Sequence, residues 1–462
     1  MNEQEWYRLR NDRTNRVDGI ILDSSAKRIG ICISNEAIQD YSTQVLCLLT
    51  LNILCRWCRK LTIEISDDIE TILPGRQGSL RNLIEKCMKD ADPYGDFIFD
   101  KVNQHRCDIL LSIGRNDKRF RSTFWVDSDG WIAGYGYGAH QGISGKSRIQ
   151  NPVGACFAAA QINSSIFKEY IGITAISNFQ KWYSLFNYQS ANSPDALVNP
   201  SIGEKINFGR VWQIGCGAVG SSFDFLLSLM NGSGIINTVD FDQVKIPNTS
   251  SSLLFTAEEA FNGIKKVTTC NFALSLNKEF LLDPIDGDFN DLIKSRDFED
   301  NYPDVILCFA NERNIWSSIQ FNCPPLVLHA TTSKNWGINF GRHIPFKEWC
   351  IVCRFGMVQL DSTPTCAEGS AKNEQGDDEI LGILPFLAPA AAVQVLAEMI
   401  KLNMIHEYPL NKNFLQFSLR NNGMSQFQLQ QMSPKIDCPV CSGHSRSDYP
   451  ESIRQKILGK FK

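Results

Sequence analysis

Short apolar segments separated by turn-forming residues predict a chain built from buried parallel strands and helices. Two of these segments begin with an aspartate: 108–114 reads Asp-Ile-Leu-Leu-Ser-Ile-Gly, and 304–310 reads Asp-Val-Ile-Leu-Cys-Phe-Ala. Continuous apolar runs of this length are typical of strands that are covered on both faces of a sheet. Two alanine-rich segments, 158–168 and 390–401, predict buried helices further along the chain. The pattern therefore indicates an α/β fold.

The same elements recur in the same order, which indicates an internal duplication. A Ser-x-x-Trp pattern, followed four residues later by an aromatic residue and glycine, begins at Ser128 and again at Ser333. The two copies are offset by 196 residues at the strand, by 205 at this pattern and by 233 at the helix-end lysines, Lys168 and Lys401. The second copy thus carries about 28 additional residues before its helix.

The duplication divides the chain into two predicted domains, residues 1–190 and 191–462. Asn, Ser, Pro and Gly gather between 187 and 205, and this composition is typical of a linker.

A glycine-rich turn of the form Gly-x-Gly-x-x-Gly follows a predicted strand, 211–214, in the second half. Its glycines are Gly215, Gly217 and Gly220. A helix is expected to open at Ser221, and the next strand, 235–239, ends at Asp240. Such glycines let the backbone turn tightly and let a phosphate approach it, and an acid at the tip of the second strand can bind ribose hydroxyls. The arrangement predicts a nucleotide site.

The first half has no equivalent turn. Its segment 28–35, Arg-Ile-Gly-Ile-Cys-Ile-Ser-Asn, predicts a strand without the three-glycine pattern. We therefore expect the first half to bind no nucleotide.

Beyond the glycine turn, the second half resembles the ThiF/MoeB/ubiquitin-activating enzyme superfamily. The resemblance is carried by Asp-x-Asp-x-Val at 240–244, by Asn248 and by a Gly-x-x-Lys sequence that ends at Lys266. It covers about 208–441 with specific motifs and extends more weakly over the first half. It implies two tandem ThiF-like, Rossmann-type domains that form a pseudo-dimer within one chain, the first degenerate and the second active.

The resemblance also implies a role for each motif residue. Asp242 would hold the ribose, Asn248 would contact the nucleotide, and Lys266 would neutralise ATP phosphates as negative charge develops at the α-phosphorus. Two family residues are missing, because the arginine of Asn-x-x-Arg falls on Ser251 and an aspartate expected to hold Mg²⁺ falls on Ala310. The candidate replacements are Asn311 and Glu312 for the acid, and Arg8, Arg10, Arg13 and Arg16 for the arginine.

Two Cys-x-x-Cys pairs fall where ThiF-like proteins place a structural Zn²⁺. Their members are Cys350, Cys353, Cys438 and Cys441. Four thiolates close a tetrahedral site and leave no open position for catalysis. A third pair, Cys55 and Cys58, lies in an apolar segment, and we expect these to be core thiols. A redox role for either of the first two pairs is the alternative.

Cys366 lies in a Thr-Cys-Ala-Glu sequence within the additional segment of the second half. This sequence resembles the crossover segment of the family, in which a cysteine attacks the acyl-adenylate and holds the product as a thioester. The chemistry favours such a residue, because a thiolate is a strong nucleophile and AMP is a good leaving group. An incidental loop thiol is the alternative.

The composition narrows the choice of partners and location. Hydrophobic residues make up 43%, charged residues 21%, and the net charge is −4, so no basic field favours nucleic acid. The best candidate for a membrane span, 45–54, is too short to cross a bilayer. The first residues do not resemble a signal peptide, and 16 cysteines then indicate free thiols or metal ligands, so we expect a cytoplasmic protein.

Together these features predict an activating enzyme that uses ATP, Mg²⁺ and a structural Zn²⁺. It would adenylate the C-terminus of a ubiquitin-like protein, capture it on Cys366 and pass it to a conjugating enzyme. This resembles the operon-encoded activating enzymes of bacterial ubiquitin-like conjugation systems, some of which act in antiviral defence.

Three alternatives stay open. One is an adenylating enzyme for a sulfur carrier or a peptide, which forms no thioester. The second is a non-catalytic ThiF-like binding module, which the losses at Ser251 and Ala310 favour. The third has a conjugating-enzyme-like first half, and the internal repeat argues against it.

Overall fold

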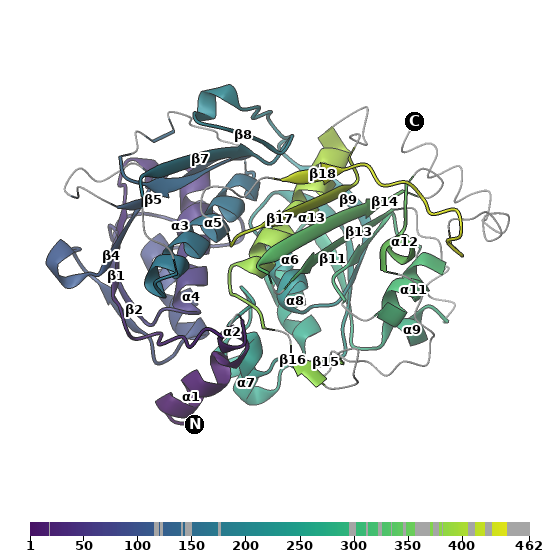
Figure 1. Cartoon of the computed structure of the whole chain (residues 1–462), viewed down its shortest axis with the longest axis horizontal. Coiled ribbons are helices and arrows are strands. Elements are labelled where there is room, and N and C mark those ends of the chain that lie inside the picture. Colours follow the sequence, from purple (N-terminus) through teal and green to yellow (C-terminus); the bar gives the residue numbers. More distant parts are fainter. Residues whose placement is uncertain are drawn as a thin grey trace.

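Two sheets of eight strands each form the framework of the described part of the chain (Figure 1). The computed structural model describes residues 1–17, 19–114, 120, 123–139, 142–143, 150–173, 177–294, 302–310, 313–321, 326–333, 335–344, 348–355, 370–372, 378–380, 382–404, 412–420 and 427–440. Of the predicted site residues, Cys366 and Cys441 lie outside these ranges, as do Asn311 and Glu312.

The first sheet has the strand order β3-β2-β1-β4-β5-β6-β7-β8. The neighbours β3, β2, β1, β4 and β5 pair in parallel. The remaining strands, β6, β7 and β8, continue the sheet with antiparallel pairing. The strands are β1 (Ile29–Ile33), β2 (Lys60–Glu64), β3 (Asp96–Phe99), β4 (Ile109–Ile113), β5 (Phe124–Asp129), β6 (Ile132–Tyr137), β7 (Phe179–Ser184) and β8 (Gln189–Ala191).

The second sheet repeats this order as β11-β10-β9-β12-β13-β14-β17-β18, with the same change from parallel to antiparallel pairing. Its strands are β9 (Ile206–Ile214), β10 (Gly232–Val239), β11 (Phe280–Ile285), β12 (Val305–Cys308), β13 (Val327–Thr332), β14 (Gly337–His343), β17 (Phe414–Ser418) and β18 (Gln428–Gln430). Eight strands in the same order support the predicted duplication. The domain boundary at residue 190 stays a prediction, although β8 belongs to the first sheet through Ala191.

Helices fill the space between and around the sheets. The first half contributes α1 (Glu3–Arg10), α2 (Asp12–Asn15), α3 (Tyr41–Cys55), α4 (Leu80–Ala91) and α5 (Val153–Tyr170). The second half contributes α6 (Ala218–Leu227), α7 (Ala257–Asn262), α8 (Lys266–Leu274), α9 (Phe289–Leu292), α11 (Arg313–Phe321), α12 (Ile351–Phe355) and α13 (Leu387–Met404). Four short 3₁₀ helices, η1 (Ala37–Gln39), η2 (Gln104–Arg106), η3 (Pro194–Ala196) and η4 (Ile246–Asn248), and a small hairpin, β15 (Ser370–Lys372) with β16 (Asp378–Ile380), complete the described elements.

Helices α5 and α13 pack against each other between the two sheets (Figure 1). Both are the alanine-rich helices of the sequence repeat, and small side chains let their backbones approach closely. Their helix-end lysines cross over symmetrically: Lys168 Nζ lies 5.7 Å from the ring centroid of Trp336, and Lys401 Nζ lies 5.8 Å from that of Trp131. Reciprocal contacts of this kind are typical of a twofold interface. The two sheets therefore share one hydrophobic core, with equivalent contacts made from each side.

One local prediction was wrong by three residues. Helix α6 begins at Ala218 rather than at Ser221, because Gly217 already has the extended conformation of an N-cap. Within the described ranges, no helix is both long and apolar enough to cross a membrane.

Candidate functional site

The three glycines of the turn after β9 have different surroundings. Gly215 has φ +96°, and a Cβ there would lie 2.9 Å from the backbone nitrogen of Ala310. A Cβ on Gly220 would lie 2.1 Å from the carbonyl oxygen of Gly215, whereas one on Gly217 would meet no atom within 4 Å. Gly215 and Gly220 thus permit the tight turn and the close packing, while Gly217 leaves the start of α6 open. An open helix N-terminus is suited to bind a phosphate.

Asp240 fastens this turn to the end of β10. Its two carboxylate oxygens accept hydrogen bonds from the backbone N–H of Cys216 (2.6 Å) and of Asp242 (2.8 Å). Burial raises the pKa of Asp240, and the nearby charge of Lys266 opposes that rise. Because the backbone occupies both oxygens, Asp240 is a support of the turn, and Asp242 is the better placed of the two acids for a ribose.

Asp242 and Lys266 meet as an ion pair at the same edge of the sheet. Lys266 Nζ lies 2.6 Å from Asp242 Oδ2, and the backbone N–H of Lys266 donates to the carbonyl of Asp242 (3.0 Å). The side chains are 10% and 28% exposed, so both are held yet reachable. Lys266 is also the first residue of α8, whose next turns pack against Cys216 of the glycine turn. The structure thus brings together the predicted cation, the predicted ribose acid and the turn.

Asn248 is the last residue of η4, next to this edge. Its Oδ1 accepts a hydrogen bond from the backbone N–H of Lys245 (2.8 Å). Helix α1 of the first half packs against η4, and Trp6 of α1 contacts Phe261 of α7. The first half therefore supports the segment that carries Asn248.

The family arginine is missing at Ser251, and the loop around Ser251 is held by another arginine, Arg56, which was not among the predicted replacements. Ser251 is buried. Around it, Arg56, which follows α3 in the first half, donates to the carbonyls of Thr249, Phe255 and Leu253. Arg56 is 2% exposed, and a buried guanidinium is stable only when its donors find acceptors. The Nε of Arg56 also donates to Asn52 Oδ1 (2.9 Å), so Arg56 holds the loop and does not stand in for a phosphate ligand.

Two of the predicted substitutes are engaged elsewhere in the first half. Arg10 is fully buried and pairs with Asp92 at 2.6 Å, and Arg16 pairs with Asp12. The signal that could have identified Arg56 is its place in a Cys-Arg-Trp-Cys sequence directly after an apolar helix, where a charged residue must be buried with a partner.

Ala310 lies at the carboxyl end of β12, beside Gly215. Its N–H donates to the carbonyl of Ile214 (3.0 Å), and its carbonyl accepts from Trp316 Nε1 (2.7 Å). The place expected for a Mg²⁺-binding carboxylate therefore holds a methyl group.

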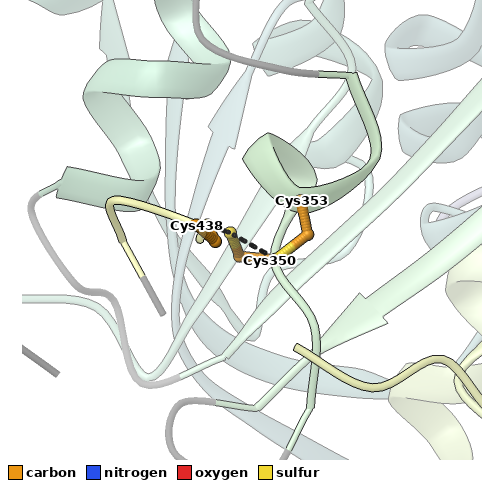
Figure 2. A group of neighbouring side chains, drawn as sticks. All are labelled: Cys350, Cys353 and Cys438. Carbon is orange, nitrogen blue, oxygen red and sulfur yellow. Dashed lines mark hydrogen bonds between the residues drawn. The ribbon is translucent and has the colours of Figure 1, made fainter. Parts of the chain in front are cut away.

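Three of the four predicted zinc ligands converge in the second half (Figure 2). Cys350 Sγ lies 3.7 Å from Cys353 Sγ and 3.6 Å from Cys438 Sγ, and all three residues are buried. Zn–S bonds of about 2.3 Å in a tetrahedron place sulfurs about 3.8 Å apart. The backbone N–H of Lys435 also points to Cys353 Sγ (3.5 Å). The spacing fits a Zn²⁺ site, and Cys441, the fourth predicted ligand, lies outside the described residues.

The third cysteine pair is part of the core, as predicted. Cys55 and Cys58 are both fully buried, and burial raises the pKa of the Cys58 thiol to about 12. Neither thiol is suited to nucleophilic chemistry at neutral pH.

A family model described as the ThiF family matches residues 194–440, which is more than half of the chain. The chain therefore belongs to the ThiF family, as its motifs predicted. No curated protein matches the sequence.

The solved structures that match include E. coli MccB with ATP, at 20% identity and a TM-score of 0.37. This match covers 50% of the present chain and 66% of the MccB chain. The microcin C7 biosynthetic enzyme MccB in complex with N-formylated MccA matches at 19% identity and a TM-score of 0.38. This match covers 69% of the present chain and 97% of the MccB chain. PaaA matches at 13% identity and a TM-score of 0.36, and the match covers 48% of the present chain and 64% of the PaaA chain. The chain thus spans 66% of the length of the first of these proteins.

Proposed function

We propose that the protein is an ATP-dependent activating enzyme whose second half adenylates the C-terminal carboxylate of a ubiquitin-like protein. The observation that carries this proposal is the open backbone at Gly217 beside the Lys266–Asp242 pair, in a chain of the ThiF family. The N–H groups at the start of α6 and the Lys266 ammonium would face the phosphates, and Asp242 would take the ribose hydroxyls.

In the proposed reaction, an oxygen of the substrate carboxylate attacks the α-phosphorus of ATP and pyrophosphate leaves. Lys266 must give up part of its contact with Asp242 as negative charge grows on the phosphate, and that exchange favours the transition state over the ground state. Mg²⁺ would neutralise the phosphates when bound. With a methyl group at Ala310, the described residues offer it few ligands, so phosphate oxygens and water would hold most of its coordination sphere.

The Zn²⁺ that we assign to Cys350, Cys353, Cys438 and Cys441 would be structural. The first two cysteines flank the start of α12, and Cys438 lies in the segment after β18. A closed thiolate site there would fasten the C-terminal segment to the second sheet without taking part in catalysis.

For the second step, we propose that the Cys366 thiolate attacks the acyl carbon of the adenylate and AMP leaves with the bonding electrons. The resulting thioester would pass to a cysteine of a conjugating enzyme. This step rests on the Thr-Cys-Ala-Glu sequence. Without it, the adenylate would pass directly to a sulfide or an amine, as in the sulfur-carrier and peptide alternatives.

The proposal is tested with purified protein, Mg-ATP and a candidate ubiquitin-like protein encoded by a neighbouring gene. ATP–pyrophosphate exchange measures adenylation, and a thiol-sensitive adduct on a non-reducing gel measures the thioester. Lys266→Ala is expected to remove both signals, and Cys366→Ala is expected to remove only the adduct. Lys265→Ala is the matched control, because Lys265 Nζ bonds the Phe241 carbonyl and Asp286 rather than Asp242.

Exchange with no adduct in the wild-type protein would contradict the thioester step and favour direct transfer. No ATP binding by the wild-type protein would contradict adenylation itself and favour the binding-module alternative.

A further inference from the structure

A second group of metal-binding side chains lies directly beneath the glycine turn. Cys216 of the turn, Asp224 of α6 and Cys270 of α8 place their two sulfurs and a carboxylate oxygen all within 4.8 Å of one another. We call these residues the sub-turn cluster. All three are fully buried, at 0% exposure. None of them belongs to the Cys350–Cys441 set or to the Lys266–Asp242 pair.

Two buried oxygens at the sub-turn cluster lack hydrogen-bond donors in the described part of the chain. Asp224 Oδ2 accepts a hydrogen bond from Gln213 Nε2 (2.9 Å), and the Cys270 thiol lies against the same carboxyl group. The buried Oδ1 makes no well-formed hydrogen bond with the described residues. The amide oxygen of Gln213, at the end of β9, has none there either. A buried carboxylate without a full set of partners costs free energy that an apolar side chain would avoid. A cation would meet this need.

We propose that the sub-turn cluster binds a structural thiophilic divalent cation, Zn²⁺ being the expected one. Cys216 and Cys270 would each lose a thiol proton and bind through sulfur, and Asp224 would bind through Oδ1. Two thiolates and a carboxylate are suited to Zn²⁺ rather than to Mg²⁺ or Ca²⁺.

The fourth ligand would be Gln213 Oε1. The amide at present turns Nε2 toward Asp224 and Cys216. A half-turn of the amide would bring the unpartnered Oε1 to that place. Small side-chain rotations would then shorten the spacings to the roughly 3.3–3.8 Å of a tetrahedral site.

The consequence for the protein is mechanical. The ion would tie the end of β9, the glycine turn, α6 and α8 to one point below the predicted phosphate position. Because Lys266 opens α8 four residues before Cys270, the same ion would hold the distance between the turn and the Lys266 ammonium. A fully buried site has no open coordination position, so the ion would load during folding and would not take part in the reaction.

The test is the metal content of the full-length protein, measured by mass spectrometry after exchange into chelator-treated buffer. Cys216→Ala/Cys270→Ala is expected to contain one equivalent of zinc less than the wild type. Cys350→Ser/Cys353→Ser, which leaves the sub-turn cluster intact, is expected to retain one equivalent. Cys47→Ala is the matched control, because Cys47 is equally buried but lies in α3 of the first half.

A second variant guards against simple misfolding of the double cysteine variant. Asp224→Asn keeps the shape of the side chain and removes its charge. It is expected to lower zinc retention during chelator dialysis at least about 10-fold, as loss of an anionic ligand should. In the Cys350→Ser/Cys353→Ser background, cobalt is expected to give a thiolate charge-transfer band that Asp224→Asn weakens.

Equal zinc content in the wild type and in Cys216→Ala/Cys270→Ala would overturn the proposal. Conversion of Cys216 and Cys270 to a disulfide in the purified protein, without metal, would overturn it as well. Both outcomes are independent of adenylation, because zinc content is measured without ATP or substrate.

Discussion

The two halves share one strand order and differ in how they cap the first long helix that follows their first strand. In the first half, that helix is α3, and its N-cap Asp40 accepts hydrogen bonds from the backbone N–H and the hydroxyl of Thr43. In the second half it is α6, and its N-cap Gly217 contributes no side-chain bond. A carboxylate therefore occupies, in one half, the place where a phosphate can bind in the other.

The surroundings of Asp40 deepen this difference. Burial raises the pKa of Asp40, and the neighbouring Asp127 and Asp129 raise it further. A cluster of acids at a helix N-terminus repels a nucleotide even when the sheet beneath it is intact. The two halves thus keep one strand order around a shared core and differ at one helix end, where we expect only the second half to bind a nucleotide.

The largest effect is expected when the N-cap of α6 in the second half is changed to aspartate, the residue that caps α3 in the first half. Gly217→Asp should abolish ATP binding, raising Kd about 100-fold or more, because its carboxylate would take the N–H groups that face the phosphates and would repel them. The fold should persist, since a side chain at this position meets open space. Calorimetric titration with ATP measures the loss. Gly217→Ala is the control without charge, and equal losses in the two variants would show that bulk rather than charge excludes ATP.

The next effect tests the arginine that joins the halves. Arg56→Met should lower the free energy of unfolding by about 3 kcal/mol, because the buried carbonyls of Thr249 and Phe255 lose the donor that Arg56 supplies. The Leu253 carbonyl keeps its bond from Asn52 Nδ2. Urea denaturation measures it. Arg59→Met, which removes a partly exposed pair with Glu3, should cost less than about 1 kcal/mol. A comparable loss in both variants would contradict a special role for Arg56.

The paired lysines of α5 and α13 offer a direct contrast between halves. Lys401 is buried with Glu398 at 2.8 Å, and Glu398 also lies 3.5 Å from Arg342. Lys401→Met should destabilise the protein by about 2 kcal/mol, because the buried Glu398 carboxylate would lose one of its two cationic neighbours and keep only Arg342. Thermal unfolding of this variant beside Lys168→Met measures the contrast. The idea fails if the two variants lose the same stability.

The smallest effect is expected for Lys168. In the internal repeat, Ser165 stands at the position that corresponds to Glu398, the partner of Lys401. Burial lowers the pKa of Lys168 to about 7. Between pH 7 and about 10, the unfolded lysine binds the proton that the folded one has lost, so stability rises with pH. The gain in stability from Lys168→Met should therefore be greatest near pH 6 and should disappear as the pH approaches 10. Urea denaturation across this range measures it, and an unchanged slope would count against the buried-lysine explanation.

The sequence by itself determined those features that depend on neighbours along the chain. The glycine turn, the Asp-x-Asp sequence, the position of Lys266 and the cysteine pairs are local patterns, and the duplication is a repetition of such patterns. Each could be recognised because the backbone geometry of a turn or a helix start is fixed by a few adjacent residues. The repeat of buried segments indicated the duplication, but it gave neither the strand order nor the exact start of α6.

Only the tertiary structure decided which residues meet across the molecule. Asp240 and Asp242 look alike in the sequence, yet one supports the turn and the other pairs with Lys266, because the end of β10 lies beside the glycine turn. Arg56 supports a loop nearly 200 residues away, and Cys216 meets Cys270 under the same turn. Contacts of this kind are set by the packing of two halves around one core. No local pattern encodes them, because each partner is buried only once the other is in place.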